Sequence, residues 1–326
     1  MTEHKNKINQ EALCSEWLEI KRVSIKYSTY VKYQTIMTSY VMPFMQENDI
    51  CSLNELVIAN YIFSLFEQKQ LSASLIQSIR YVLKSVYLYA EQKFHLKIIN
   101  FNYVRVPTQK TVSKTLTEKE EAALFRYCQN DISPASLAIY LGLYAGLRLG
   151  EACALQGQDI DLKQGIITIS KTAQRIRTGK ESGAKTSIMI SNPKSHSSSR
   201  QVVIPDFLVE YLEAYFNMTQ VFQENPQAFL LTGSDAAPEP RTIQRRFGRI
   251  CQKHGFTTNF HTLRHTYATN CIKLGIDVKT VSEMLGHSNI ATTLNRYVHP
   301  SLEFKKSQIN KFQKNHENDC FSQQLK

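Results

Sequence analysis

The segment 261-HTLRHTYATNCIKLG-275 has the composition of a helix whose first residues include two histidines and an arginine. His261 and Arg264 are three residues apart and share one helical face, while His265 lies one turn after His261. Because an arginine keeps its charge, this face suits a phosphate. Histidines at this spacing also occur in zinc sites, but the glutamate of the HExxH motif is absent and Arg264 would lie beside the metal. The segment therefore favours a phosphate site over a zinc site.

A second arginine stands among small apolar residues in the segment AGLRLGE, residues 145–151. A buried arginine has to be paired with an acid or directed at an anion, because its charge cannot be lost. Glu151 follows Arg148 by three residues and is placed to contact it from the same helical face. The segment therefore predicts either a structural Arg–Glu pair or a second cation for a phosphate.

Two more segments carry candidate residues that have ordinary explanations when taken singly. In LGHSNIATTLNRYVHP, residues 285–300, Gly286 is predicted to end one helix, His287 lies in the following turn, and Tyr297 lies near the end of the next helix. In KSHSSSR, residues 194–200, Lys194 lies in a polar turn before the predicted strand QVVIP. A half-buried tyrosine and a solvated lysine would account for both segments.

The composition is that of a basic globular protein. The 326 residues suit two domains, and the hydrophobic fraction of 42% is enough for packed cores. Lys and Arg total 39 against 28 Asp and Glu, a formal charge of +11, which favours a polyanionic partner, with simple solubility as the alternative. Seven scattered cysteines, a polar start without a signal peptide and the lack of a long apolar run predict a cytoplasmic protein without a membrane span.

Helical periodicity runs from residue 11 to about residue 95. The candidate N-caps of these helices are Ser28, Ser52 and Ser72. The periodicity stops between about 97 and 114, where a proline and several cations predict a basic linker. Thr117 and Glu120 then have the spacing of a capping box, which predicts that the next helix begins there.

The pattern after residue 117 is mixed. Helices to about Leu155 are followed by three predicted strands, GIITISK, TSIMIS and RQVVIP, which polar turns separate. Helical periodicity returns from Asp206 onward. This half of the chain is therefore predicted to be mostly helical, with a small antiparallel β-sheet inserted.

Taken together and in order, AGLRLGE, KSHSSSR, HTLRH and LGHSNIATTLNRYVHP resemble the motifs of the tyrosine recombinases, the phage-integrase group. The order is specific because several independent short motifs have to occur in sequence, and the resemblance covers about residues 11–305. It implies a mainly α fold with a small antiparallel sheet (α+β). The implied parts are a flexible N-terminus (1–10), a helical core DNA-binding domain (11–98), a basic linker (99–114), a catalytic domain (115–305) and a C-terminal tail (306–326).

The resemblance also implies the chemistry and the residues that perform it. The implied catalytic residues are Arg148, Lys194, His261, Arg264, His287 and Tyr297. Tyr297 would attack a DNA phosphate and form a 3′-phosphotyrosine, which conserves the bond energy so that rejoining needs no ATP. Arg148 and Arg264 would hold the charge that develops on the phosphate oxygens. The family's mechanism implies no cofactor and no metal.

The other residues of the set would handle protons and support. Lys194 would protonate the leaving 5′ oxygen, His261 would assist proton transfer at the tyrosine, and His287 would donate to a non-bridging oxygen. Glu151 occupies the acidic position of the family and would support the site. The competitors of Lys194 are Lys171, Lys180 and Lys185, because the connection is long. Lys194 is preferred because its K-S-x-x-S-x-R spacing before a strand and a proline fits the family.

The implied partners are double-stranded DNA, gripped in a C-shaped clamp, and three further copies of the chain, since recombination cuts two duplexes twice each. The tail is expected to contact a neighbouring protomer, and an accessory DNA-bending or directionality factor is possible, although no arm-binding domain is expected before residue 11. The long insert in the hairpin favours integration or excision of a mobile element. The alternatives are chromosome-dimer resolution, DNA inversion, a type IB topoisomerase, a binding-only descendant and a zinc hydrolase.

Overall fold

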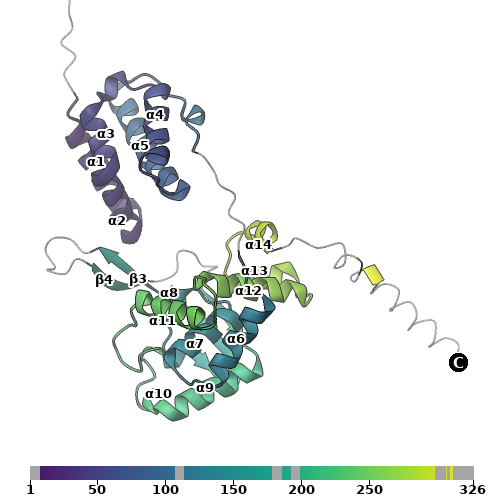
Figure 1. The fold of residues 1–326 in the computed structure, drawn as a ribbon. Helices are drawn as coiled ribbons and strands as arrows, with labels where there is room; N and C mark the ends of the chain where they lie inside the picture. The colour runs from purple at the N-terminus through teal and green to yellow at the C-terminus, as the bar shows by residue number, and fades with distance from the viewer. Residues whose placement is uncertain are drawn as a thin grey trace, which may run out of the picture. The chain divides into compact units, whose positions relative to one another are not determined.

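The computed structural model describes residues 8–106, 114–177, 186–191 and 199–297, together with residues 306, 309 and 310 (Figure 1). The chain divides into two compact units, Met1–Val112 and Ser113–Lys326. Each unit buries its own cluster of apolar side chains. The mainly α fold with small antiparallel sheets confirms the predicted fold class.

The first unit is a bundle of helices. Its elements are α1 (Gln10–Ser24), α2 (Tyr27–Ile36), a π-helical turn (Met37–Val41), α3 (Met42–Glu47), a 3-10 turn (Ile50–Ser52), α4 (Glu55–Glu67), α5 (Ala73–Phe94) and a second 3-10 turn (Phe101–Tyr103). The longest of these, α5, buries Ile76, Ile79, Val82 and Val86 completely. Ile79, Val82 and Val86 belong to the pattern that predicted this helix, whose fourth member, Leu75, is half-buried.

Two of the three serines predicted as N-caps do not cap a helix. Ser72 accepts a hydrogen bond from the backbone N–H of Leu75 at 3.3 Å and caps α5 as predicted. The cap of α4 is Asn54, which lies next to the first helical residue, whereas Ser52 belongs to the preceding 3-10 turn. Ser28 lies inside α2, which begins at Tyr27 without a side-chain cap. Neighbouring polar residues compete for a cap, and the backbone path decides between them.

The chain after α5 contributes to the core of the first unit. Ile99, Phe101 and Val104 are buried against the helices. Arg80 holds this segment from α5 through hydrogen bonds to the carbonyl oxygens of Phe101 and Val104. The first unit therefore extends past residue 98, and residues 107–113 of the predicted linker lie outside the described part of the chain.

The second unit is built around the helix α7. Its helices are α6 (Glu118–Gln129), α7 (Pro134–Tyr144), α8 (Leu149–Ala152), α9 (Asp206–Thr219), α10 (Val221–Glu224), α11 (Pro240–Lys253), α12 (His261–Lys273), α13 (Val278–Leu285) and α14 (Ile290–Tyr297). The helix α7 packs against α6, α9, α11 and α12, and most of its side chains are buried (Figure 1). The capping box at Thr117 and Glu120 begins α6 as predicted.

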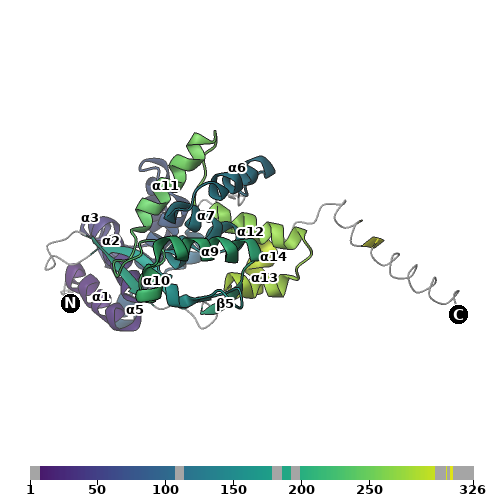
Figure 2. The same ribbon diagram turned by 90° about the horizontal axis from the view of Figure 1, so that it is seen from below.

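The last three helices of the described chain, α12, α13 and α14, pack against one another and lie side by side in Figure 2. They share a small buried cluster that includes Tyr267, Val281, Leu285 and Tyr297. Gly286 ends α13 in the left-handed conformation, at φ 64°, as the sequence predicted. No helix in the described part of the chain is both long and apolar enough to span a membrane.

The strands form two small antiparallel sheets. The first has the order β1 (Ile160–Asp161), β2 (Ile166–Ile169), β5 (Arg200–Val203), and the second pairs β3 (Thr172–Arg177) with β4 (Thr186–Ser191). The strand β3 was not among the predicted strands, because the polar residues of TAQRIR resemble a turn. The strand β5 contacts α13, so the start of β5 lies beside the helix that leads to His287 (Figure 2).

Candidate active site

The first arginine lies at the turn between α7 and α8. Arg148 is the N-cap residue of α8, and Glu151 in the first turn accepts its backbone N–H at 2.9 Å and its side-chain Nη1 at 2.6 Å. The predicted contact between Arg148 and Glu151 is confirmed. The Arg148 side chain remains 38% exposed, so its guanidinium is accessible to a ligand from solvent.

The second arginine, Arg264 on α12, is 1% exposed and joins three segments of the unit. It donates from Nη1 to the carbonyl oxygen of Gly146 at 2.7 Å and from Nη2 to that of Leu285 at the end of α13. Its Nη1 also lies 3.9 Å from Glu151. The structure therefore brings Arg148 and Arg264, which are 116 positions apart in the chain, to the same carboxylate.

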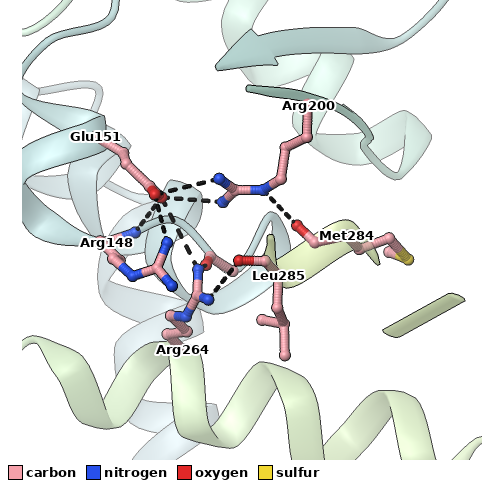
Figure 3. Close-up of polar contacts among 7 residues, drawn as sticks. Arg148, Glu151, Arg200, Arg264, Met284 and Leu285 are labelled. Atoms are coloured by element: carbon pink, nitrogen blue, oxygen red, sulfur yellow. Dashed lines mark hydrogen bonds and ion pairs between the residues drawn. The ribbon is translucent and has the colours of Figure 1, made fainter. Parts of the chain in front are cut away.

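A third arginine completes this cluster (Figure 3). Arg200, the first residue of β5, donates to Glu151 Oε1 at 3.1 Å and to Oε2 at 2.9 Å, and its Nε donates to the carbonyl oxygen of Met284 at 2.6 Å. From the sequence, Arg200 was considered only as the last residue of the motif that contains Lys194. Nothing in the sequence distinguishes an arginine that heads a strand from a surface arginine, so this role was missed.

The three arginines act on the ionisation of Glu151. Burial alone would raise the pKa of Glu151, but the hydrogen bond from Arg200 and the charges of Arg200, Arg148 and Arg264 lower it to about 2. Burial lowers the pKa of Arg264 to about 9, the charge of Arg148 acts in the same direction, and Glu151 opposes both. Three guanidinium groups and one carboxylate leave a net positive charge of two in the cluster, which suits an anion.

The predicted nucleophile lies beside the second of the two histidines of HTLRH. The Tyr297 hydroxyl is 2.7 Å from Nδ1 of His265, and both side chains are buried. Ionised Tyr297 would raise the pKa of Arg264, so the phenol oxygen and the guanidinium are within electrostatic reach of each other. From the sequence, His265 was considered only as a zinc ligand, and its contact with Tyr297 was missed.

The two predicted histidines lie on either side of this pair. The ring of His261, at the exposed start of α12, contacts the ring of His265 edge to face, with centroids 4.4 Å apart. The ring of His287 is parallel to that of Tyr297, with centroids 6.4 Å apart. His287 Nδ1 lies 2.8 Å from the hydroxyl of Thr293, which is fully buried on α14. The contact with Thr293 orients the ring of His287.

Three of the four candidate lysines lie outside the described residues. Lys194, Lys180 and Lys185 all fall in the segments 178–185 and 192–198. Lys171 is described, and its Nζ donates to the side chain of Gln156. The preference for Lys194 stays a prediction. Among the described residues, no three His, Cys, Asp or Glu side chains are grouped so that they could hold a metal ion.

Comparison with known proteins adds to this geometry. A model of the phage integrase family matches residues 114–303. The tyrosine recombinase XerC-like protein of Caldanaerobacter subterraneus subsp. tengcongensis is 26% identical to this chain over 312 residues, which cover 88% of this chain and 78% of that protein.

Two solved structures share the fold at lower identity. The Tn1549 transposon integrase in complex with transposon right end DNA has a TM-score of 0.70 at 21% identity, over 92% of this chain and 98% of that chain. A lambda integrase tetramer bound to a Holliday junction has a TM-score of 0.63 at 16% identity, over 89% of this chain and 78% of that chain. Both similarities extend over most of this chain.

Proposed function

The chain belongs to the phage integrase family, the tyrosine recombinases, and from that premise we propose that it breaks and rejoins double-stranded DNA through a covalent bond between Tyr297 and a backbone phosphate. The observation that carries this proposal is the position of the Tyr297 hydroxyl. It forms a hydrogen bond with His265, the residue that follows Arg264. A phenol beside a group of guanidinium ions suits attack on a phosphodiester.

Arg148 and Arg264 are proposed to stabilise the charge on the non-bridging oxygens. An arginine presents five N–H donors in a plane, so Arg264 retains donor capacity beyond its two bonds to backbone carbonyls. Arg148 is the more accessible of the two and is suited to contact an incoming phosphate directly. Glu151, which all three arginines surround, is proposed to fix their directions and not to touch the DNA.

Three further residues are proposed to move protons or donate hydrogen bonds. Lys194 protonates the leaving 5′ oxygen, His287 donates to a non-bridging oxygen, and His261 assists proton transfer near the nucleophile. The orientation of His287 by Thr293 supports its part of this scheme. The scheme needs no metal and no cofactor, because the guanidinium groups supply the positive charge.

The direct test is covalent capture of DNA. A pool of nicked duplexes of randomised sequence is incubated with the protein, and the molecules that become attached to it are selected and sequenced. We expect the wild-type protein to select a defined sequence. Digestion of the covalent adduct should leave a phosphotyrosine peptide that contains Tyr297. Tyr297→Phe should bind the selected duplex with similar affinity and capture none. Capture at another residue, or no capture by the wild type, would contradict the proposal.

The proposed partners are DNA and further copies of the chain. The lambda integrase structure is a tetramer on a Holliday junction, which supports a homotetramer on DNA for this chain. The first unit is proposed to grip the duplex, the tail after residue 305 to contact a neighbouring protomer, and an accessory protein to set direction. Crosslinking on the selected duplex should give tetramers for the full chain; monomers alone would argue against this assembly.

The biological setting is proposed to be the integration or excision of a mobile element. The fold shared with a transposon integrase over 92% of this chain supports it. The similarity to a XerC-like protein over 88% of this chain favours a second candidate, recombination of the chromosome. Mapping the covalent adducts across the genome separates the two, because an element gives adducts at two ends that flank its own genes, whereas chromosome resolution gives one locus.

A further inference from the structure

The contact between Tyr297 and His265 connects the proposed nucleophile to an ionisable side chain. Nδ1 of His265 lies 2.7 Å from the hydroxyl oxygen, a normal length for a hydrogen bond from a phenol. Tyr297 is 7% exposed and His265 is 8% exposed, so little water reaches either group. The helices that carry them, α12 and α14, pack against each other, which holds the two side chains together.

The tautomer of His265 with its proton on Nε2 presents a lone pair on Nδ1 to this hydroxyl. In that tautomer the phenol donates to the imidazole, and the proton points along the path that it takes when the oxygen attacks a phosphate. We propose that His265 is a catalytic residue, the base that accepts the proton of Tyr297 during DNA cleavage and returns it during rejoining. This inference rests on the proposed function and assigns its base.

The proton and bond changes of the step balance. The Tyr297 oxygen forms a bond to phosphorus while its proton moves to Nδ1 of His265, which becomes an imidazolium. The bond from phosphorus to the 5′ oxygen breaks, and that oxygen takes a proton from the acid, proposed above to be Lys194. Rejoining reverses each transfer: the 5′ hydroxyl attacks, its proton returns to the acid, and the departing phenol oxygen recovers its proton from His265.

The geometry points to His265 as the proton acceptor in preference to His261. The resemblance to the tyrosine recombinases implied that His261 assists proton transfer at the tyrosine. In the structure, His261 contacts the ring of His265, while the ring nitrogen of His265 meets the hydroxyl. A base has to lie within about 2.6–3.2 Å of the atom that carries the proton, measured between heavy atoms, or reach it through one water. The ring of His261 thus lies next to the imidazolium that forms.

The test uses the nicked duplex selected by the wild-type protein and measures the single-turnover rate of adduct formation. His265→Asn is the informative variant, because the asparagine amide occupies the place of Nδ1 and preserves a hydrogen bond while it cannot accept a proton. We expect the rate to fall by about 10²–10⁴-fold, the usual contribution of a general base. Duplex binding by the variant should stay within a few-fold of that of the wild type.

A more acidic phenol at position 297 distinguishes two roles for His265: a base that accepts the proton, and a group that only positions the nucleophile. Fluorination of the ring at Tyr297 makes its hydroxyl easier to ionise and reduces the need for a base. The fluorinated His265→Asn protein should therefore recover part of the lost rate, whereas fluorinated wild type should change little. If His265→Asn fails to bind the duplex, His265→Gln takes its place in the same comparison.

A second substrate distinguishes the proposed base, His265, from the proposed acid, Lys194. A 5′-bridging phosphorothiolate provides a leaving group that needs no proton, so it should restore cleavage to Lys194→Ala and not to His265→Asn. The proposal is overturned if His265→Asn cleaves at the wild-type rate, or if fluorination restores His261→Asn and not His265→Asn. Failure of the wild type itself to form an adduct would instead contradict the proposed function.

Discussion

Glu151 is the residue that all three arginines of the cluster contact. Its ionisation is expected to make the stability of the second unit depend on pH. Its pKa is lowered from the ordinary 4.5 to about 2. A carboxyl whose pKa is lower in the folded protein contributes stability that is present above its unfolded pKa and is lost as the pH falls through the folded value. The difference in pKa corresponds to roughly 3 kcal/mol at neutral pH.

Glu151→Gln should therefore lower the free energy of unfolding most at pH 5 and above, and the difference from wild type should shrink as the pH falls from 5 toward 3. Urea unfolding of the second unit at several pH values measures this. Glu213→Gln is the control, since Glu213 lies in the same unit at an exposed position of α9 and should change stability little at any pH. A loss that does not depend on pH would show that Glu151 acts through packing alone.

Thr293 is predicted to act on catalysis through the orientation of His287. Its hydroxyl lies 2.8 Å from Nδ1 of that ring, and valine has nearly the same shape without the hydroxyl. Thr293→Val should slow adduct formation about tenfold to a hundredfold, because an unpaired polar group costs about 1–3 kcal/mol. Thr292→Val, at the less buried neighbouring position, should keep the wild-type rate. Equal rates for both variants would remove Thr293 from the scheme.

At the scale of elements, the turn between α7 and α8 connects Arg148 and Arg264, the two arginines that are proposed to be catalytic. Gly146 has a φ of 65°, and a Cβ on it would lie 2.5 Å from the ring of Tyr267 on α12. Its carbonyl oxygen accepts the hydrogen bond from Arg264. The turn therefore needs glycine both for its backbone conformation and for the close approach of α12.

Gly146→Ala should lower the free energy of unfolding by roughly 2–5 kcal/mol, from the left-handed conformation together with overpacking. Gly248→Ala is the matched control, because Gly248 lies in α11 and a Cβ added there would have no heavy atom within 4 Å. That change should stabilise the helix by about 0.5–1 kcal/mol. Denaturant unfolding measures both, and a neutral Gly146→Ala would mean that the turn adapts.

The elements also show which local signals were sufficient for prediction. The capping box at Thr117 and Glu120 and the glycine at position 286 began or ended helices as predicted, because both motifs act through backbone groups within a few residues. The strand β3 was missed, because its sequence is polar and its backbone hydrogen bonds form only when it pairs with β4, up to 19 positions along the chain. A strand's pairing partner is not a local property.

At the scale of the whole molecule, the two units have separate apolar cores, and this predicts separable unfolding. Ile79 is fully buried in the first unit, and Ile167 is fully buried in the second. Ile79→Ala should destabilise the first unit by about 2–5 kcal/mol and shift only its calorimetric transition, while Ile167→Ala should shift the other. Ile98→Ala, at an exposed position of the first unit, serves as the control. A common shift of one transition would mean that the units unfold together.

The amino-acid sequence by itself determined the helical character of both units, the order of the arginine, histidine and tyrosine motifs, and the family that they indicate. These follow from periodicity and from contacts three or four residues apart, which the helix itself imposes. Tertiary structure alone decided that Arg200 meets Glu151 across 49 positions and that His265 meets Tyr297 across 32. Such contacts depend on how β5, α12 and α14 pack, and packing is set by the whole core and not by any local spacing.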